Sequence, residues 1–477
     1  MDVESKMNYF KQEMSKNTGN NEGRSSARKR IESILDEESF MEYYVFKREE
    51  DGQGNEIIAG SGTISHRPVY VMAQDSSING GIITDKGGEK VLGLIEQAGK
   101  TGAPLISIFD GQGVQVENSW DTLELFGKLF SAYATYSGII PLLTLVAGYC
   151  PGALSFAVPL SDFVFGIKDR SFIYLNPPQA IKDVTGKDIT FEELGGAEVN
   201  AQKTGNIHFL AENDEEACKN LRALVEYLPL NNLEKSPVKE PGDDINRLSP
   251  GIIDLMKEDY DVRDIIKELA DENIFMEIQE SFASNLVTGF VRINGYSLGV
   301  LANQPSVLKG SLDLNSSEKG AGFIRFCDAF NIPLFTLVDV PGYLSTIYQE
   351  QSGITKKAAK LIFAYAEASV PKITLITGKC YGVAGISMGS KYLKVDQVLA
   401  WPTAQIGALS PGGLSSLFSL PEAETEKAVS PYEAVLQGLV DDLIDPEESR
   451  LHIAYTLEFL KTGRKLAPGK KHGNFPV

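Results

Sequence analysis

The sequence contains one pattern twice, and this internal repeat limits the possible folds more than any other feature of the chain. Matching segments share apolar runs and turn residues, and their offset stays between 229 and 235 positions. The matching pairs are 34–42 with 269–277, 63–75 with 292–304, 103–113 with 332–342, 138–153 with 368–383, and 175–181 with 409–415. Chance similarity between apolar runs would not keep so constant an offset, so two copies of one folding unit are expected.

The length of 477 residues also favours two domains, because a single hydrophobic core rarely grows beyond about 250 to 300 residues. Residues 228–251 lie between the copies and combine four prolines with many polar side chains, which is typical of an extended linker. We therefore expect a first domain at 1–235, a linker at 236–251 and a second domain at 252–477.

Each copy alternates short apolar runs with helical patterns. Runs such as 105–110 and 142–148 are rich in Leu, Ile and Val, whereas 86–100 and 353–368 have helical periodicity. Continuous apolar strands that alternate with helices indicate parallel strands buried on both faces of a sheet. Each half is therefore expected to be one α/β domain.

The composition excludes several classes of partner. The formal net charge of −19 argues against binding to nucleic acid or to an anionic membrane, because phosphate requires a basic surface. The four widely separated cysteines predict neither a disulfide framework nor a zinc site, and a cytoplasmic location without a signal peptide is expected. The uncharged segment 137–160 is long enough to span a bilayer, but its prolines and glycines predict a buried strand, a turn and a helix.

The two copies share a glycine-rich turn. In each copy we expect an apolar strand to end at Gly148 or Gly378 and to continue past Gly152 or Gly382 into a helix of small residues. Backbone N–H groups at a helix N-terminus have no partner within the helix, so they can bind an anion. The turn lacks the glycine spacing of a P-loop or a dinucleotide-binding fold, which leaves an oxyanion hole as the functional interpretation. The alternative is that the glycines only allow close packing of strand and helix.

Few side chains near these turns suggest chemistry. The four histidines lie outside the turns and give no support for a histidine base. They are His66, His208, His452 and His472. Asp110 and Asp339 are equivalent in the repeat and end apolar strands, where capping of a turn is favoured over contact with a ligand. Isolated basic residues usually lie on solvated surfaces, but four are candidates for contact with nucleotide phosphates. They are Lys86, Lys90, Lys168 and Arg170.

Longer motifs carry a resemblance to a known family. The second half contains LANQPSVLKGSLDLNSSEKGAGFIRFCDAFNIPLFTLVDVPGY, KLIFAYAEASVPKITLITGKCYGVAGISMGSKYL and AWPTAQIG, and the first half contains SARKRIESILDEESF and DITFEELGGAEVNAQKTGNIHFLAENDEEA. Nearly end to end, the chain resembles the carboxyltransferase subunit of biotin-dependent acyl-CoA carboxylases, the propionyl-CoA carboxylase β type. It equally resembles the α subunit of sodium-pumping acyl-CoA decarboxylases.

The resemblance implies two crotonase-like domains related by an internal repeat, with acyl-CoA on the N-terminal domain and biotin on the C-terminal domain of a neighbouring subunit. Amides at Gly152 and Ala153 would hold the thioester oxygen, and amides at Val383 and Ala384 would hold the biotin ureido oxygen. The resemblance also assigns substrate contacts. They fall on Gly80, Gly81, Lys86, Gly382 and Ile386.

The resemblance further implies partners. They are a biotin carboxyl carrier protein, either a biotin carboxylase or a membrane decarboxylase subunit, and further copies of the chain in a hexamer built as a trimer of dimers. The chain itself has neither the biotin-attachment MKM tripeptide nor the ATP-binding glycine loop of a biotin carboxylase. The acyl-CoA, of the acetyl, propionyl or methylmalonyl class, and the direction of the reaction are left open.

Two departures from the family pattern support an alternative. Val383 stands where relatives have Gly, and a β-branched residue does not adopt the positive φ that Gly allows. A helical insert before the PYEA segment is also largely missing, since only SLPEAETEKAVS remains. A non-catalytic scaffold homologue is therefore one alternative, and a crotonase-type hydratase or isomerase that acts without biotin is another.

Overall fold

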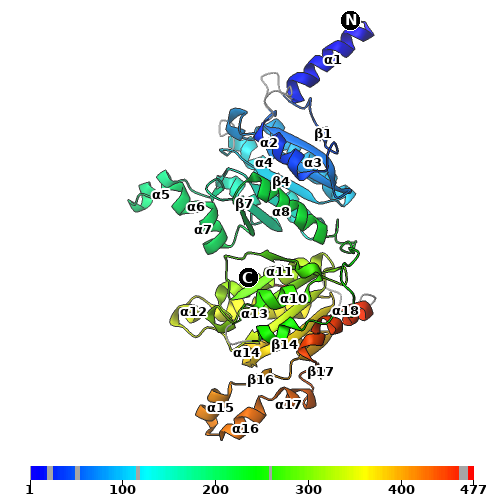
Figure 1. Ribbon diagram of the computed structural model, residues 1–477. Helices are drawn as coiled ribbons and strands as arrows, with labels where there is room; N and C mark the ends of the chain where they lie inside the picture. Colours follow the sequence, from blue (N-terminus) through cyan, green and yellow to red (C-terminus); the bar gives the residue numbers. More distant parts are fainter. Residues whose placement is uncertain are drawn as a thin grey trace. The chain divides into compact units, whose positions relative to one another are not determined.

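The computed structural model describes residues 2–18, 25–48, 54–113, 119–256, 260–460 and 471–476. The chain divides into two compact units, Met1–Glu234 and Lys235–Val477 (Figure 1). Part of the segment expected as a linker hydrogen-bonds to the second unit. Lys239 donates its N–H to the carbonyl of Gly295 at 3.0 Å, and Ser249 donates its N–H to the carbonyl of Glu447 at 2.8 Å.

The first unit is built on a seven-stranded sheet with the order β1-β2-β3-β4-β5-β7-β9. The first three strands pair antiparallel, and every pair from β3 to β9 is parallel. The strands of this unit are β1 (Met41–Tyr43), β2 (Ile57–Ile64), β3 (Arg67–Gln74), β4 (Leu105–Phe109), β5 (Leu142–Val146), β6 (Tyr149–Pro151), β7 (Phe163–Ile167), β8 (Phe172–Tyr174) and β9 (Phe209–Ala211). The short strands β6 and β8 pair with each other outside the main sheet.

Helices cover both faces of the first sheet. On one face, α3 and α4 pack on alternate side chains of the strands, and together they form a core that includes Val91, Leu129 and Val146. Helices α2 and α8 contact each other and the sheet strands β3 and β7. The helices are α1 (Val3–Thr18), α2 (Ser26–Ile34), α3 (Asp85–Thr101), α4 (Ser119–Tyr136), α5 (Pro178–Thr185), α6 (Phe191–Gly195), α7 (Ala197–Val199) and α8 (Asp214–Tyr227), with the short η1 (Asn79–Gly81), η2 (Gly152–Ala157) and η3 (Asn200–Thr204).

The second unit repeats this topology with the order β10-β11-β12-β13-β14-β15-β17, and β16 pairs with the end of β14. The strands are β10 (Phe275–Ile278), β11 (Leu286–Ile293), β12 (Tyr296–Asn303), β13 (Leu334–Val340), β14 (Lys372–Tyr381), β15 (Gln397–Ala400), β16 (Gln405–Gly407) and β17 (Asp442–Leu443). As in the first unit, the first three strands pair antiparallel and the later pairs are parallel. The repeat seen in the sequence is therefore a repeat of folded units.

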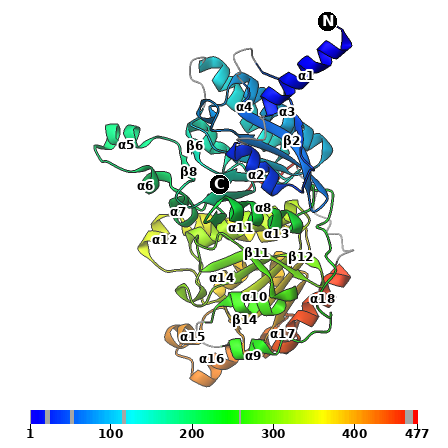
Figure 2. The ribbon, with the colours of Figure 1, turned by 45° about the horizontal axis from the view of Figure 1, so that its top comes forward.

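Helices α10 and α18 pack on one face of the second sheet in a core with Val300 and Trp401, whereas α11 and α13 contact each other and α11 contacts the sheet strands (Figure 2). The helices are α9 (Gly251–Leu255), α10 (Val262–Leu269), α11 (Leu314–Ala329), α12 (Ile347–Gln351), α13 (Ile354–Glu367), α14 (Gly382–Ser387), α15 (Pro411–Phe418), α16 (Glu422–Ala428), α17 (Pro431–Leu436) and α18 (Ser449–Leu460), with the short η4 (Asp271–Asn273), η5 (Leu308–Gly310), η6 (Lys391–Leu393) and η7 (Pro446–Glu448).

The apolar segment 137–160 folds as β5, β6 and η2, which is the strand, turn and helix expected from its prolines and glycines. Among the described residues, no helix combines the length and the apolar character needed to cross a membrane.

Two buried lysines occupy equivalent positions in the repeat. Lys90 on α3 donates to the carbonyl of Gly54 at 2.5 Å, and Lys319 on α11 donates to the carbonyls of Gln279 and Phe282 at 2.9 and 2.8 Å. Burial lowers the pKa of both amines, that of Lys319 to about 7. Each lysine therefore ties a central helix to the loop that precedes a sheet strand.

The low pKa of Lys319 predicts a pH-dependent contribution to stability. Between pH 7 and about 10 the unfolded chain binds a proton at this side chain and the folded chain does not, so the contribution to stability rises with pH. We expect the difference in unfolding free energy between the unmodified chain and Lys319→Met to grow by up to about 1.4 kcal/mol per pH unit over this range. Urea denaturation at several pH values measures it.

Lys100→Met is the matched control, because this α3 lysine is 73% exposed. Its curve should run parallel to that of the unmodified chain. If the unfolding free energy of Lys319→Met also changes with pH in parallel with that of the unmodified chain, the pKa of the Lys319 amine is not lowered in the folded protein.

Candidate functional site

In both units the repeated turns lie at the carboxyl ends of parallel strands, where ligands bind in open α/β sheets. In the first unit, η1 follows β3, Asp110 follows β4 and the turn with Gly152 follows β5 and β6. In the second unit, η5 follows β12, Asp339 lies in β13 and the turn with Gly382 follows β14. These strands are neighbours in their sheets, so the three segments of each unit share one edge.

The turn of the first unit begins with Gly152 in the left-handed region, at φ +62°. A Cβ at this position would meet no atom within 4 Å, so the backbone conformation, and not crowding, requires glycine here. Pro151 has no N–H, so its parallel pairing with Tyr174 uses the N–H of Gly152, whereas the N–H of Ala153 lies in the first turn of η2 and has no partner within that helix. The following helix η2 is a short 3-10 helix, in which Ser155 Oγ donates to the carbonyl of Gly152 at 2.7 Å.

The turn of the second unit differs from the expected one in where its strand ends. Strand β14 does not stop at Gly378 but runs to Tyr381, because its last residues Lys379–Tyr381 pair with β16. Gly382 then has φ +56° and opens α14. The N–H groups of Val383 and Ala384 lie in the first turn of α14, where N–H groups have no partner within the helix.

The conformation of this turn removes one reason for a scaffold interpretation. The positive φ falls on Gly382, and Val383 is not among the residues with positive φ. The valine therefore occupies an ordinary helical position, which a β-branched residue adopts without strain. Its side chain is 56% exposed, as is expected of a residue that faces a ligand or another surface.

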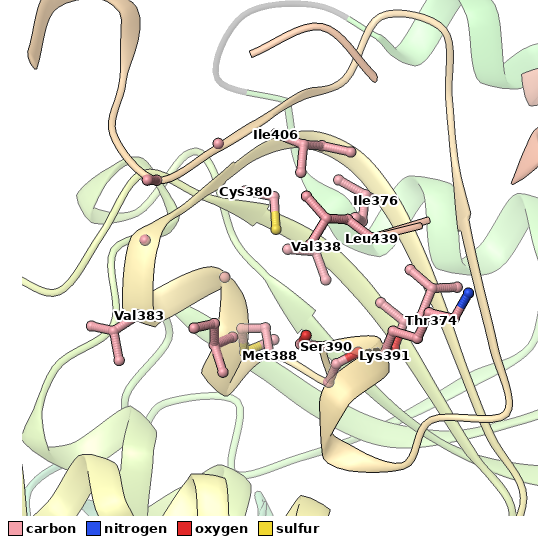
Figure 3. Close-up of a pocket in the computed structure, with 17 residues that line it drawn as sticks. Val338, Thr374, Ile376, Cys380, Val383, Met388, Ser390, Lys391, Ile406 and Leu439 are labelled. Carbon is pink, nitrogen blue, oxygen red and sulfur yellow. Dashed lines mark hydrogen bonds between the residues drawn. The ribbon is translucent and has the colours of Figure 1, made fainter. Parts of the chain in front are cut away.

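A pocket of about 390 Å³ lies beside α14 (Figure 3). Most of its lining is apolar and comes from α14 and from β13, β14 and β16, including Val338, Ile376 and Ile406. Figure 3 shows the Val383 side chain directed away from these residues, whereas Thr374 and Lys391 lie at the side of the pocket remote from Val383. The pocket can therefore accept a small, largely apolar group beside the first N–H groups of α14.

The polar side chains at this pocket are neutral or paired. Lys391 Nζ lies 2.5 Å from Oδ1 of Asp441, and Thr374 Oγ1 donates to the carbonyl of Gly389 at 2.8 Å. Burial raises the pKa of the Cys380 thiol to about 12, so it is no thiolate nucleophile near neutral pH. Within the described part of the chain, no group of three or more His, Cys, Asp or Glu side chains is placed to hold a metal ion.

In the first unit the structure brings Gly80 and Gly81 to the turn of Gly152 through the loop after β4. Gln112 donates its N–H to the carbonyl of Gly80 at 3.0 Å, and Gly111 donates its N–H to the carbonyl of Tyr149 at 3.0 Å. A Cβ at Gly81 would lie 2.5 Å from the carbonyl oxygen of Asp110, so this approach requires glycine. Gly80 itself lies in η1 in the left-handed region, at φ +64°.

The candidate cations are not gathered in one cluster. Lys86 lies in the first turn of α3 and pairs with Glu89 at 3.2 Å, and Lys90 is buried. Lys168 pairs with Glu212 at 3.5 Å, and Arg170 pairs with Asp214. All four amines or guanidinium groups thus have partners within the chain, and of the two that lie on α3, Lys86 is in its first turn whereas Lys90 is buried.

Some features of the site were missed in the sequence. Lys391 and Asp441 stand 50 positions apart, and nothing in the repeat marks Asp441 as a partner. Ile386, expected as a substrate contact, lines the pocket and is 45% exposed. His208 has a structural role: it accepts a hydrogen bond from the N–H of Val164 at 3.2 Å and packs edge-on against Phe163.

Comparison with known proteins gives consistent results. The sequence profile of the family described as the carboxyl transferase domain matches residues 18–475. The propionyl-CoA carboxylase β chain of Roseobacter denitrificans is 38% identical over 480 residues, which cover 95% of this chain and 94% of that one. The methylmalonyl-CoA decarboxylase α subunit of Propionigenium modestum is also 38% identical, over 95% of this chain and 94% of that one.

A solved structure agrees over the whole length. The transcarboxylase 12S subunit, crystallised as a hexamer with methylmalonyl-coenzyme A and methylmalonic acid bound, has a TM-score of 0.95 and 38% identity, and the match covers 100% of both chains. This likeness confirms the expected fold class, two crotonase-like α/β domains related by an internal repeat. The missing helical insert thus leaves the fold intact.

The two turn glycines should differ in their tolerance of a side chain. Gly152→Ala should lower the unfolding free energy by about 1 to 2 kcal/mol, since only the left-handed backbone opposes the methyl group. Gly382→Ala should cost more, because its Cβ would also lie 3.1 Å from the carbonyl oxygen of Ala408. Chemical denaturation measures both.

Gly127→Ala is the control, since Gly127 lies exposed within α4 with no atom within 4 Å of its Cβ and no positive φ. This variant should be as stable as the unmodified chain or slightly more stable. Equal effects at Gly152 and Gly382 would contradict the geometry of the second turn.

Proposed function

The chain belongs to the carboxyl transferase domain family, and we propose that it transfers a carboxyl group between biotin on a carrier protein and a short acyl-CoA. The observation that carries this proposal is the pair of equivalent turns, each with a positive-φ glycine after which a helix begins and presents its first backbone N–H groups. A single such turn would serve an acyl-CoA alone. Two turns suit a reaction in which each of two substrates carries a carbonyl oxygen that gains negative charge.

The first turn serves the acyl-CoA. The N–H of Ala153 donates to the thioester oxygen, which becomes negatively charged as the α-carbon turns into an enolate carbon. The resemblance also places the N–H of Gly152 here, but this group pairs with the carbonyl of Tyr174 in the structure. Each well-placed donor of this kind contributes about 3 to 4 kcal/mol to the stability of a transition state. Gly80 lies at the same edge of the sheet, and its N–H offers a further donor to the thioester oxygen.

The second turn serves biotin, which arrives on a partner protein and is therefore a substrate of this chain. Biotin supplies the N1′ atom that carries the carboxyl group in transit. The N–H groups of Val383 and Ala384 donate to its ureido oxygen, and the apolar pocket beside α14 takes the apolar part of a bound group. The residues present fit such a molecule, because it combines a polar ureido edge with an apolar ring system.

The chain's side chains contribute shape and exclude water. The thiol of Cys380 has a pKa of about 12, and Lys391 is paired with Asp441, so no side chain at this pocket is poised as a general base at neutral pH. The proton of the α-carbon is then handled by the substrates themselves while the two turns hold the oxygens. The pocket beside α14 therefore offers no side-chain base of the kind that a hydratase or isomerase uses.

The substrate class follows from the pocket and the relatives. We assign short acyl groups of the acetyl, propionyl or methylmalonyl class, because the relatives are named for propionyl-CoA and methylmalonyl-CoA and because Ile386 presents an apolar side chain at the pocket. Gly80, Gly81 and Lys86 are assigned to the acyl-CoA, with Lys86 offering its amine to a phosphate. Gly382 and Ile386 are assigned to the biotin side.

The proposed assembly is a homo-oligomer, a hexamer like that of the transcarboxylase 12S subunit. Four large apolar side chains on or beside α15 and α17 are more than 60% exposed in the single chain, as a surface covered by another copy requires. They are Leu417, Phe418, Tyr432 and Leu436. A biotin carboxyl carrier protein is the second partner, and the cytoplasm is the proposed location.

A second candidate role is the α subunit of a membrane-coupled acyl-CoA decarboxylase. It is favoured by the decarboxylase α subunits, which are as similar to this chain as the carboxylase β chains are, at 38% identity. The half-reaction on this chain is the same in both cases. Purification from the native cells would bring down either a biotin carboxylase or a membrane subunit, and thus decide between them.

The half-reaction is tested with the purified oligomer, free biotin and malonyl-CoA or methylmalonyl-CoA. We expect the acyl-CoA to lose its carboxyl group only when biotin is present. Mass spectrometry of the acyl-CoA measures this loss. The relative rates rank the acyl groups. Failure to bind any of the acyl-CoA compounds, together with no turnover on a biotinylated carrier domain, would refute the proposal in favour of a scaffold.

Deleting one backbone donor should abolish transfer without changing a reactive side chain. Val383→Pro removes the N–H at a position in the first helical turn where proline is tolerated, and the rate should fall about 10²- to 10³-fold. Val383→Ala is the control and should keep most of the activity, because it retains the N–H. Equal activity of the two folded variants would show that this N–H is no donor to the reacting oxygen.

A further inference from the structure

The same hydrogen-bonded bridge occurs in both copies, next to the turns. In each copy an amide side chain at the end of a sheet strand connects the short helix that follows this strand to the aspartate of the next strand. The sequence favours a capping role for Asp110 and Asp339 but indicates no role for the amides Gln74 and Asn303. Both the two aspartates and the two amides stand 229 positions apart.

In the second unit the bridge is centred on Asn303. Its Nδ2 donates to the carbonyl of Gly310 at 3.2 Å, and its Oδ1 accepts from the N–H of Asp339 at 3.3 Å. Asn303 is 1% exposed, so both contacts lie away from water. A Cβ at Gly310 would lie 2.3 Å from the carbonyl oxygen of Asp339, which shows how closely η5 approaches the end of β13.

Asp339 continues the bridge to the turn that precedes α14. Its Oδ1 accepts from the N–H of Lys379 at 2.9 Å, three residues before Gly382. The carboxylate also covers Gly378, where a Cβ would lie 2.5 Å from it. Tyr260 faces the same carboxylate and hydrogen-bonds to Thr377 Oγ1 at 3.1 Å. Asn303 and Asp339 together thus fix the carboxyl end of β14 relative to η5.

The first unit builds the bridge from Gln74. Its Nε2 donates to the carbonyl of Gly81 at 2.8 Å, and its Oε1 accepts from the N–H of Asp110 at 3.1 Å. The Asp110 carboxylate accepts from Arg30 Nη1 at 2.8 Å and covers Gly148, where a Cβ would lie 2.1 Å from Oδ1. The bonds to Gln74 are shorter than those to Asn303, as the longer side chain allows.

We propose that Asn303 with Asp339, and Gln74 with Asp110, are positioning residues that hold the two N–H-bearing segments of each unit in register. This inference rests on the proposed function for its catalytic consequence. The amide bridge fixes the short helix η1 or η5, and the aspartate fixes the strand end from which the turn begins. An oxyanion held by the N–H groups of a turn requires that the turn does not move by more than about 0.5 Å relative to the rest of the site.

The division of substrates between the units makes the bridges separately testable. Asn303→Ala should lower the turnover number of carboxyl transfer by about tenfold or more, while the dissociation constant of acyl-CoA stays within about twofold of that of the unmodified chain. Gln74→Ala is the matched variant in the other copy and should raise the dissociation constant of acyl-CoA by about fivefold as well as lowering turnover. Steady-state kinetics with a biotinylated carrier and calorimetry with acyl-CoA give these values.

Asn303→Gln separates positioning from loss of packing. It keeps the amide and copies the residue of the first unit, whose bonds are shorter, so turnover should stay within about threefold of that of the unmodified oligomer. Loss of turnover in Asn303→Gln as large as in Asn303→Ala would overturn the proposal. Unchanged turnover in a folded Asn303→Ala variant would overturn it equally.

Hydrogen exchange provides a readout that does not depend on activity. In the intact oligomer, Asn303→Ala should speed exchange in both 308–312 and 379–385, because the bridge joins these segments. Unchanged exchange in 379–385 would refute the bridge as a connection. If the unmodified chain transfers no carboxyl group, the proposed function fails, and the exchange measurement still decides whether Asn303 holds the two segments.

Discussion

The proposed site depends on the first backbone N–H groups of η2 and α14, which have no partner within their helices. A buried or half-buried N–H without a hydrogen bond is costly, so such groups persist only where a ligand or water satisfies them. Here they stand at the start of η2 and α14, and a glycine with positive φ precedes Ala153 and Val383 in each case. In both units the left-handed glycine is the residue at which the chain passes from the strand into the helix. The chemistry is therefore a property of the backbone path, and the side chains serve to fix that path.

Duplication explains how one chain acquires two such sites. Both units place the turn after the central parallel strands, and both hold it with an aspartate that covers a glycine, Asp110 over Gly148 and Asp339 over Gly378. The units then differ in what surrounds the aspartate. The first uses an ion pair with the buried Arg30, whereas the second uses the N–H of Lys379 and Tyr260. In the function we propose, the shared part holds the turns that bind the oxyanions, and the divergent part accounts for the difference between the two substrates.

Much of the fold was predictable because the repeat fixed which segments are equivalent and the apolar runs fixed which are buried strands. The turns were also predictable, since Gly152 and Gly382 stand at matching positions. The continuation of β14 past Gly378 was not, because it depends on pairing with β16, a strand too short to be seen in the sequence. It was also not predictable that Val383 fits the turn without backbone strain, because only the structure shows that the positive φ falls on Gly382. The pair Lys391 and Asp441, 50 positions apart, likewise required the fold.

The most direct test of the central claim is the structure of the oligomer with a non-reactive acyl-CoA and biotin bound. The account predicts that the thioester oxygen lies about 2.7 to 3.1 Å from the backbone nitrogen of Ala153 and that the ureido oxygen lies equally close to that of Val383 or Ala384. Oxygens that are held by side chains instead, or that lie away from both turns, would contradict it.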